Sequence, residues 1–131
     1  MLQGVRVLDL TDEPGFLAGK ILGDLGADVV KVEPPGGHRA RKSGPFAGGA
    51  ASPERSLLWA AHNTSKRGIV LDLASDAGRG DLVRLAEVAD VLLETADPGA
   101  LDALGLGARV LRQRNPRLVY CAITPFGQTG P

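Results

Sequence analysis

Residues 4–33, GVRVLDLTDEPGFLAGKILGDLGADVVKVE, decide the fold, because they join two apolar segments through one segment with helical spacing. Residues 4–10 and 27–33 are rich in Val and Leu, and such runs are typical of buried strands in parallel sheets. A strand, a helix and a strand within about 30 residues form a βαβ unit, whose crossover is right-handed in nearly all proteins. The stretch therefore predicts the start of an α/β fold.

The helix between these two strands has recognisable start and stop signals. Thr11 or Asp12 can cap its N-terminus, Pro14 fits its first turn, and Gly26 ends it. Glu13 could form an acid/base pair with Asp12, but capping explains both residues without a further role. The apolar residues at helical spacing are Leu17, Ile21, Leu22 and Leu25.

The rest of the chain repeats this alternation of strands and helices. The remaining helices are expected over residues 54–63, 75–89, 97–105 and 108–115, and the remaining strands over 67–73, 90–95 and 117–123. Residues 34–53 lack periodicity and predict a long exposed loop. The pattern predicts one domain over residues 1–131, with a doubly wound, mostly parallel, Rossmann-like sheet and helices on both faces.

Charge and cysteine content limit the possible functions. Fifteen Lys and Arg residues balance fifteen Asp and Glu residues, so no overall field attracts nucleic acid or an anionic membrane. Cys121 is the single cysteine, which fits a reducing cytoplasm. No stretch reaches the roughly 18 consecutive apolar residues of a membrane span. We therefore expect a cytoplasmic protein with no nucleic-acid partner and no membrane partner.

The common nucleotide-binding and metal-binding motifs are missing from the sequence. No G-x-G-x-x-G follows the first expected strand, and no G-x-x-x-x-G-K-[ST] occurs anywhere. A generic nucleotide-binding domain is therefore the weakest interpretation. His38 and His62 lie in different segments, and no His and Cys residues have metal-ligand spacing, so no metal site is expected.

Six segments occur in one order along the chain: GVRVLDLT, LGADVVKVEPPGG, SKRGIVLDL, ADVLLE, PGALDALGLG and NPRLVYCAITPFGQTGP. Their order and spacing resemble the N-terminal part of family III coenzyme A transferases, which include formyl-CoA transferases, carnitine-type CoA-transferases and α-methylacyl-CoA racemases. The resemblance covers essentially all 131 residues. It implies a Rossmann-like large domain that binds coenzyme A or acyl-CoA as a substrate, with a carboxylic acid as acceptor.

The resemblance also implies where the reaction takes place. Transferases of this family use an aspartate, reached shortly after the GQTGP segment at 127–131, to attack the acyl-CoA thioester and form a mixed anhydride. That position lies beyond Pro131, so no residue here inherits a catalytic role, and we expect the chain alone to be inactive. Three interpretations stay open: the N-terminal portion of a transferase, the same portion of an acyl-CoA racemase, and a non-catalytic partner or scaffold subunit.

By resemblance, four segments supply contacts to coenzyme A. They fall on Glu13 and Pro14 after the first strand, on Leu71, Asp72, Leu73 and Ala74 after the third, on Thr95, Ala96 and Asp97 after the fourth, and on Ala103 in the next helix. Basic residues common in the family are missing at Ala74 and Ala103. We expect Arg39, Arg41 and Lys42, in the basic run at 38–42, to take over the phosphate contacts. The alternative is that this run is a solvated loop.

The resemblance further predicts association between chains. Full-length members of the family consist of two interlocked chains. In a chain of this length, apolar surface that is covered in the whole protein would be exposed, and such surface promotes association. We therefore expect a homo-oligomer, or pairing with a homologous chain.

Overall fold

A computed structural model describes residues 1–129 and contains one sheet of five strands. The strand order is β3-β2-β1-β4-β5, and every pairing between neighbouring strands is parallel. The predicted doubly wound α/β fold is therefore confirmed. The last two residues of the GQTGP segment lie outside the described residues. The strands are β1 (Arg6–Leu10), β2 (Asp28–Glu33), β3 (Lys66–Val70), β4 (Val91–Glu94) and β5 (Val119–Ala122).

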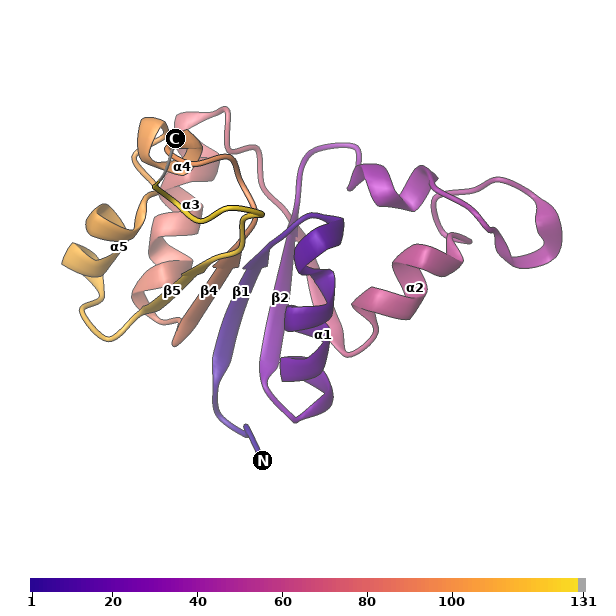
Figure 1. Ribbon diagram of the computed structural model, residues 1–131, viewed down its shortest axis with the longest axis horizontal. Coiled ribbons are helices and arrows are strands. Elements are labelled where there is room, and N and C mark those ends of the chain that lie inside the picture. The colour runs from indigo at the N-terminus through magenta and orange to yellow at the C-terminus, as the bar shows by residue number, and fades with distance from the viewer. Residues whose placement is uncertain (130–131) are drawn as a thin grey trace.

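The helices form two groups on the sheet (Figure 1). One group pairs α1 (Phe16–Asp24) with α2 (Leu57–Asn63), and the other pairs α3 (Asp76–Glu87) with α5 (Ala108–Arg114). The shorter elements are α4 (Ala100–Ala103) and the 3-10 turns η1 (Glu13–Gly15), η2 (Arg39–Lys42) and η3 (Ala47–Gly49). The segment between β2 and α2 projects away from the sheet, as Figure 1 shows. Across residues 1–129, no helix combines the length and hydrophobicity that a membrane crossing requires.

The alternation of side chains along β1 divides the core into two layers. Leu8 faces α3 and α5, whose Leu82 and Leu111 are fully buried in the larger hydrophobic cluster. Val7 belongs to a smaller cluster on the opposite face, where Leu22 of α1 packs against it. The sheet is covered on both faces here, and Val7, Leu8 and Asp9 of its central strand are all buried.

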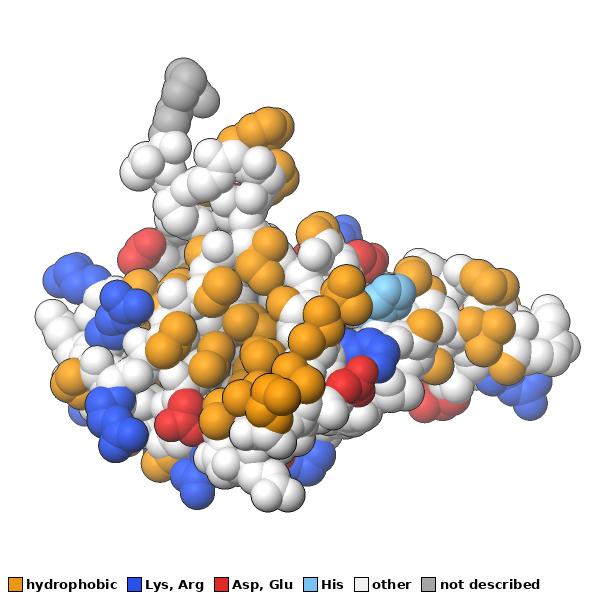
Figure 2. Space-filling model, turned by 60° about the horizontal axis from the view of Figure 1, so that its bottom comes forward, with side chains coloured by type: hydrophobic (Ala, Val, Ile, Leu, Met, Phe, Trp, Pro, Cys, Tyr) orange, Lys and Arg blue, Asp and Glu red, His pale blue; other side chains and the backbone are white. Residues whose placement is uncertain are grey.

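Helix α1 buries only a narrow face. Phe16 is 1% exposed, and Gly19 packs so closely on β1 that a Cβ there would lie 2.2 Å from Oδ2 of Asp9. On the outer side of the same helix, Leu17 and Ile21 are 55% and 49% exposed. Figure 2 shows hydrophobic side chains gathered broadly over one face of the molecule. Some of the apolar residues whose spacing predicted the helix therefore lie on the surface.

The N-terminus of α1 differs from the predicted cap. Gly15 is the N-cap residue of α1, and Asp12 is the N-cap residue of the preceding turn η1, but neither position has a side-chain capping hydrogen bond. The Asp12 carboxylate contacts His38 instead, at 2.6 Å, and the Thr11 hydroxyl donates to Asp9. The prediction that Thr11 or Asp12 caps this helix is therefore wrong, because Thr11 bonds locally to Asp9 and Asp12 bonds to the distant His38.

Candidate functional site

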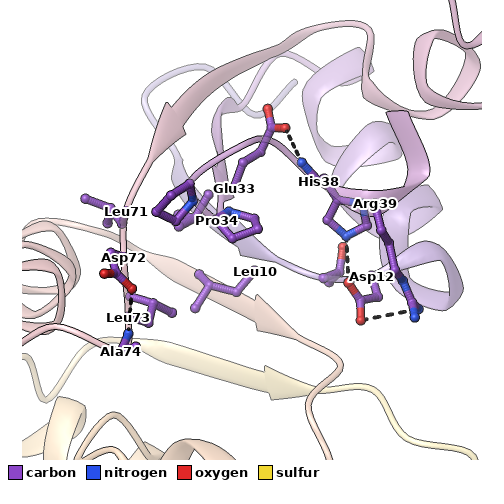
Figure 3. A pocket seen from close by; sticks show the side chains of 13 residues that line it. Leu10, Asp12, Glu33, Pro34, His38, Arg39, Leu71, Asp72, Leu73 and Ala74 are labelled. Atoms are coloured by element: carbon purple, nitrogen blue, oxygen red, sulfur yellow. Dashed lines mark hydrogen bonds and ion pairs between the residues drawn. The ribbon is translucent and has the colours of Figure 1, made fainter. Parts of the chain in front are cut away.

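An open cavity of about 490 Å³ lies at the carboxyl ends of β1, β2 and β3 (Figure 3). Ligands of doubly wound sheets bind beyond the carboxyl ends of the strands, and this cavity has that position. We therefore take it as the candidate site. Its lining consists of Leu10, Thr11, Asp12, Val32, Glu33, Pro34, Pro35, His38, Arg39, Leu71, Asp72, Leu73 and Ala74.

The walls of the cavity are largely apolar. Leu10, Pro34 and Leu73 come from three different segments and surround the same space in Figure 3. Asp72 is polar, but its Oδ1 accepts a hydrogen bond from the N–H of Ala74 at 3.0 Å, so its carboxylate helps to shape its own turn. An apolar wall of this kind is suited to a flat ring.

Arg41 is committed to a buried carboxylate. Its Nε and Nη2 donate to the two carboxylate oxygens of Glu33 at 2.6 and 2.8 Å, and its guanidinium lies 4.2 Å from the ring centre of Trp59. Burial disfavours the charged form of Glu33, but hydrogen bonds from Arg41 and from the N–H of His38 outweigh it and lower the pKa of Glu33. Arg41 therefore lies beside the cavity and does not line it.

Arg39 lies at the rim of the cavity. Its side chain is 72% exposed, and its Nη2 lies 3.0 Å from Oε2 of Glu13 and 3.6 Å from Oδ2 of Asp12. The hydrogen bond to Glu13, followed by the charge of Asp12, raises the pKa of Arg39. Among the described residues that line the cavity, Arg39 is the single Lys or Arg. The structure thus separates the two arginines that the sequence grouped together.

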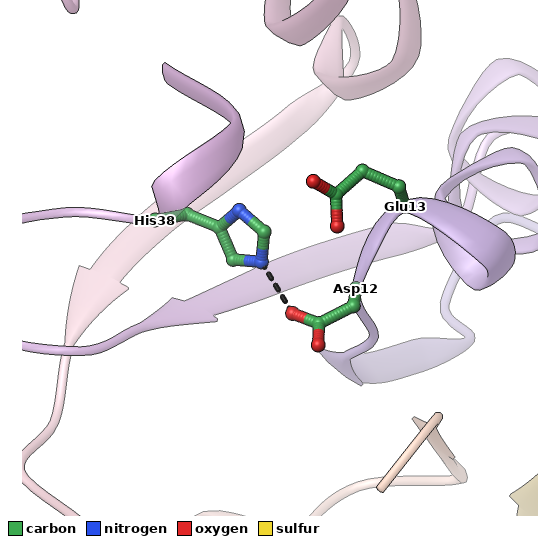
Figure 4. Close-up of side chains that lie close together, drawn as sticks. All are labelled: Asp12, Glu13 and His38. Atoms are coloured by element: carbon green, nitrogen blue, oxygen red, sulfur yellow. Dashed lines mark hydrogen bonds and ion pairs between the residues drawn. The ribbon is translucent and has the colours of Figure 1, made fainter. Parts of the chain in front are cut away.

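His38 is a buried imidazole that is fixed on several sides. Its Nδ1 accepts a hydrogen bond from the N–H of Ala40 at 3.1 Å, so the proton of the neutral ring is on Nε2. Nε2 then donates to Oδ1 of Asp12 at 2.6 Å (Figure 4). The ring also packs edge-on against Phe16 and beside Trp59, with centroids 5.1 and 5.5 Å apart. His38 therefore holds the Asp12 carboxylate in one orientation.

Asp12, Glu13 and His38 together have the composition of a cation site, and their ligand atoms lie within 4.8 Å of one another. Their donor chemistry does not fit that role. Nε2 of His38 carries a proton, so its lone pair is not available to a metal ion. The guanidinium of Arg39 already lies against both carboxylates. The cluster is an internal network of hydrogen bonds and ion pairs.

A buried charged cluster that the sequence analysis did not predict lies beneath the segment after β1. Lys31 Nζ and Lys66 Nζ lie 3.3 and 2.8 Å from the two carboxylate oxygens of Asp9, and all three side chains are at most 2% exposed. Burial opposes the charge on Asp9, but the two lysines outweigh it and lower the pKa of Asp9. Lys31 also donates to the carbonyl of Thr11, and Lys66 to that of Phe16. The cluster therefore anchors the start of the candidate site.

The segment after β4 meets the segment after β1. The strand order reverses at β1, which has β2 on one side and β4 on the other, and such a switch point opens a crevice between the two segments. Across it, the N–H of Asp12 donates to Oγ1 of Thr95 at 2.7 Å. The N–H of Ala96 donates to Glu94 at 2.6 Å. Thr95 and Ala96 join these segments and do not line the first cavity.

Three residues expected to contact coenzyme A lie away from the first cavity. Asp97 lines a second cavity of about 490 Å³, together with Glu94, whose pKa is raised by burial. Ala103 and Pro14 are exposed and line neither of these two cavities. The structure therefore brings residues 71–74 and Arg39 together around the first cavity, while Glu13 contacts Arg39 from outside.

Comparison with known families gives the context of this site. A family model described as CoA-transferase family III matches residues 2–131. The chain belongs to this family. The resemblance seen in the sequence is thereby confirmed, and the parallel sheet with its cavity is the N-terminal part of a family III protein.

Curated relatives of this family III chain are CoA-transferases by name. "Probable fatty acyl-CoA transferase Rv3272" of Mycobacterium tuberculosis is 43% identical over 131 residues, which are 99% of this chain and 33% of the relative. Subunit BbsE of succinyl-CoA:(R)-benzylsuccinate CoA-transferase of Thauera aromatica is 43% identical over 126 residues, which are 96% of this chain and 31% of the relative. Human succinyl-CoA:glutarate CoA-transferase is 41% identical over 133 residues, and the match covers 99% of this chain and 29% of the relative. The chain spans about a third of the length of these relatives.

Solved structures of family III proteins have the same fold. A CAIB/BAIF family protein from Brucella suis matches 98% of this chain with a TM-score of 0.89 and 40% sequence identity, and the match covers 34% of that protein. A crystal structure of Rv3272 from M. tuberculosis matches 99% of the chain with a TM-score of 0.88 and 42% identity, covering 36% of that protein. The fold therefore agrees with proteins that share well over a third of the sequence.

Proposed function

We propose that the chain is the CoA-binding N-terminal portion of a family III acyl-CoA transferase. The observation that carries this proposal is the cavity beyond β1, β2 and β3, where apolar walls meet the cation of Arg39 at the rim. Coenzyme A combines a flat adenine ring with several phosphates, and therefore needs an apolar slot beside a positive charge. In this proposal the adenosine end contacts residues 71–74, and a phosphate contacts Arg39.

The reaction proposed for the longer protein is the transfer of CoA between carboxylic acids through an aspartyl mixed anhydride. In this proposal the chain contributes substrate binding and not the nucleophile. Asp12, Glu33 and Asp72 line the cavity, but each already accepts a hydrogen bond from another protein group. A carboxylate held in this way is a poor candidate for attack on a thioester.

Calorimetric titration with free coenzyme A tests the binding proposal. We expect Arg39→Ala to weaken binding about tenfold, because a charge-assisted contact to phosphate is lost. Lys42→Ala is the matched control, since Lys42 is an exposed cation of the same turn η2 and does not line the cavity. Its affinity should stay within about twofold of the wild-type value. Wild-type chain that does not bind, or an Arg39→Ala variant that binds as tightly as wild type, would contradict the proposal.

A non-catalytic partner subunit is the alternative function, and exposed apolar surface favours it. Leu17 and Ile21 leave one side of α1 uncovered, and the BbsE relative is a subunit by name. We therefore propose that the chain pairs with a second copy of itself or with a homologous chain. We also propose a cytoplasmic location, because the single cysteine, Cys121, is free.

A further inference from the structure

Arg39, the cation proposed to receive a phosphate, is already held by two carboxylates. Its Nη2 donates to Oε2 of Glu13 at 3.0 Å and lies 3.6 Å from Oδ2 of Asp12. One positive and two negative groups leave this small cluster with a net charge of −1. An anion that approaches the rim of the cavity therefore meets a cation whose field is cancelled.

The two carboxylates are held very differently. Asp12 is fixed at both ends, because its Oδ1 accepts from the buried His38 and its backbone N–H donates to Thr95. The Glu13 side chain is about one-third exposed (34%), and its described hydrogen bond is the one from Arg39. Glu13 can therefore leave Arg39 by a side-chain rotation, whereas Asp12 cannot move without breaking its contact with His38.

We propose that Glu13 sets the affinity of the cavity for phosphate-bearing ligands by competing with them for Arg39. Binding is then an exchange, in which Arg39 gives up the carboxylate of Glu13 and gains a phosphate, while His38 keeps Asp12 in place. The identity of the ligand as coenzyme A rests on the proposed function. The competition itself rests on the contacts of Arg39 alone. Glu13, which the sequence analysis expected to contact coenzyme A, thereby opposes the ligand.

The change Glu13→Gln keeps the size of the side chain and removes its charge. At low ionic strength we expect this variant to bind phosphate-bearing ligands about three- to tenfold more tightly than the wild type, because a neutral amide competes less strongly for Arg39 than a carboxylate does. The gain in affinity should shrink as salt is added, since Arg39 is exposed and Glu13 is partly exposed.

The experiment titrates wild-type chain and Glu13→Gln with two probes, inorganic pyrophosphate and free coenzyme A, at low and at physiological salt. The double variant Glu13→Gln/Arg39→Ala tests whether the gain in affinity depends on Arg39. Glu87→Gln is the matched control, because Glu87 is an exposed carboxylate on α3 that lies 3.9 Å from Arg114 and away from the cavity. The control should bind both probes as the wild type does.

The two probes separate this inference from the proposed function. A gain for Glu13→Gln that disappears in the double variant supports the competition. If that gain is seen with pyrophosphate while no variant binds coenzyme A, the competition stands and the CoA-binding proposal fails. If Glu13→Gln binds neither probe more tightly than wild type, or if the gain persists without Arg39, the competition is overturned.

Discussion

At the scale of single residues, the segment after β1 depends on Asp9. Its carboxylate pairs with both Lys31 and Lys66, and these two ammonium groups in turn donate to the carbonyls of Thr11 and Phe16. The backbone that leads to Asp12 is therefore tied to β2 and β3 through one buried negative charge. Without that charge, two buried cations would face each other.

We expect Asp9→Asn to lower the free energy of unfolding by about 3–5 kcal/mol, because removing one member of a buried ion pair leaves the other unpaired. Urea denaturation followed by circular dichroism measures this loss. Asp28→Asn is the control, since Asp28 pairs with Arg67 on the surface and should cost less than about 1 kcal/mol. Equal losses in the two variants would contradict the role assigned to Asp9.

The stability lost in Asp9→Asn has a predicted pH dependence. The pKa of Asp9 is lowered in the folded chain, so its contribution to stability is present above the unfolded pKa of about 3.9 and is lost as the pH falls through the folded value. The difference in unfolding free energy between wild type and Asp9→Asn should therefore narrow in acid. A difference in unfolding free energy that grows as the pH falls would contradict this prediction.

The sequence could predict which segments form the site better than which side chains face it. Residues 71–74 follow a strand, and the parallel topology alone brings them to the cavity. Arg39 and Arg41 are two residues apart in the same turn, yet one lines the cavity and the other pairs with Glu33. Which of the two arginines lines the cavity depends on the position of Glu33 in the folded chain. The charges of Asp9 and Lys31 inside apolar strands were a signal of the buried cluster that sequence reasoning could have used.

At the scale of elements, the contact between α1 and β1 depends on one glycine. Gly19 lets the helix approach until its missing Cβ would lie 2.2 Å from Asp9 Oδ2. Gly80 in α3 has nothing within 4 Å of its Cβ position. A side chain at position 19 would therefore collide with β1, whereas position 80 has room for one. Both glycines weaken the intrinsic helix preference.

We expect Gly19→Ala to destabilise the chain by about 1–3 kcal/mol, because the new methyl group must push Asp9 or the helix out of place. Gly80→Ala should stabilise it by about 0.5–1 kcal/mol, since alanine is the better helix former and the space is open. Thermal unfolding of both variants measures whether each substitution raises or lowers the stability. A stabilising Gly19→Ala would show that α1 does not press on β1 as described.

Strands were easier to predict than helix ends. Apolar runs predicted all five strands, and they were clearest for β1, β2 and β4, where most residues are buried between the helices. The start of α1 was predicted less well, since Pro14 and Gly15 belong to a separate turn and Asp12 finds a partner in His38. The expected loop at 34–53 contains two 3-10 turns, η2 and η3, whose short length leaves no periodicity to read.

At the scale of the whole molecule, the exposed side of α1 predicts association. We expect wild-type chain to self-associate in the micromolar range, and Leu17→Gln/Ile21→Gln to remain monomeric, because burial of these side chains is then no longer favourable. Analytical ultracentrifugation over a concentration series measures this. Val88→Gln, at an equally exposed valine after α3, should behave as the wild type does. A monomeric wild type over the whole series would contradict the proposed pairing.

The buried charged cluster beneath the segment after β1 also governs how the folded chain can be labelled. Two of the four lysines, Lys31 and Lys66, have their amines enclosed by protein. An amine-directed dye, crosslinker or surface coupling can therefore attach only at Lys20, Lys42 or the amino terminus while the fold is intact. Such reagents leave the buried cluster unmodified, and modification of Lys31 or Lys66 marks molecules in which the fold has opened.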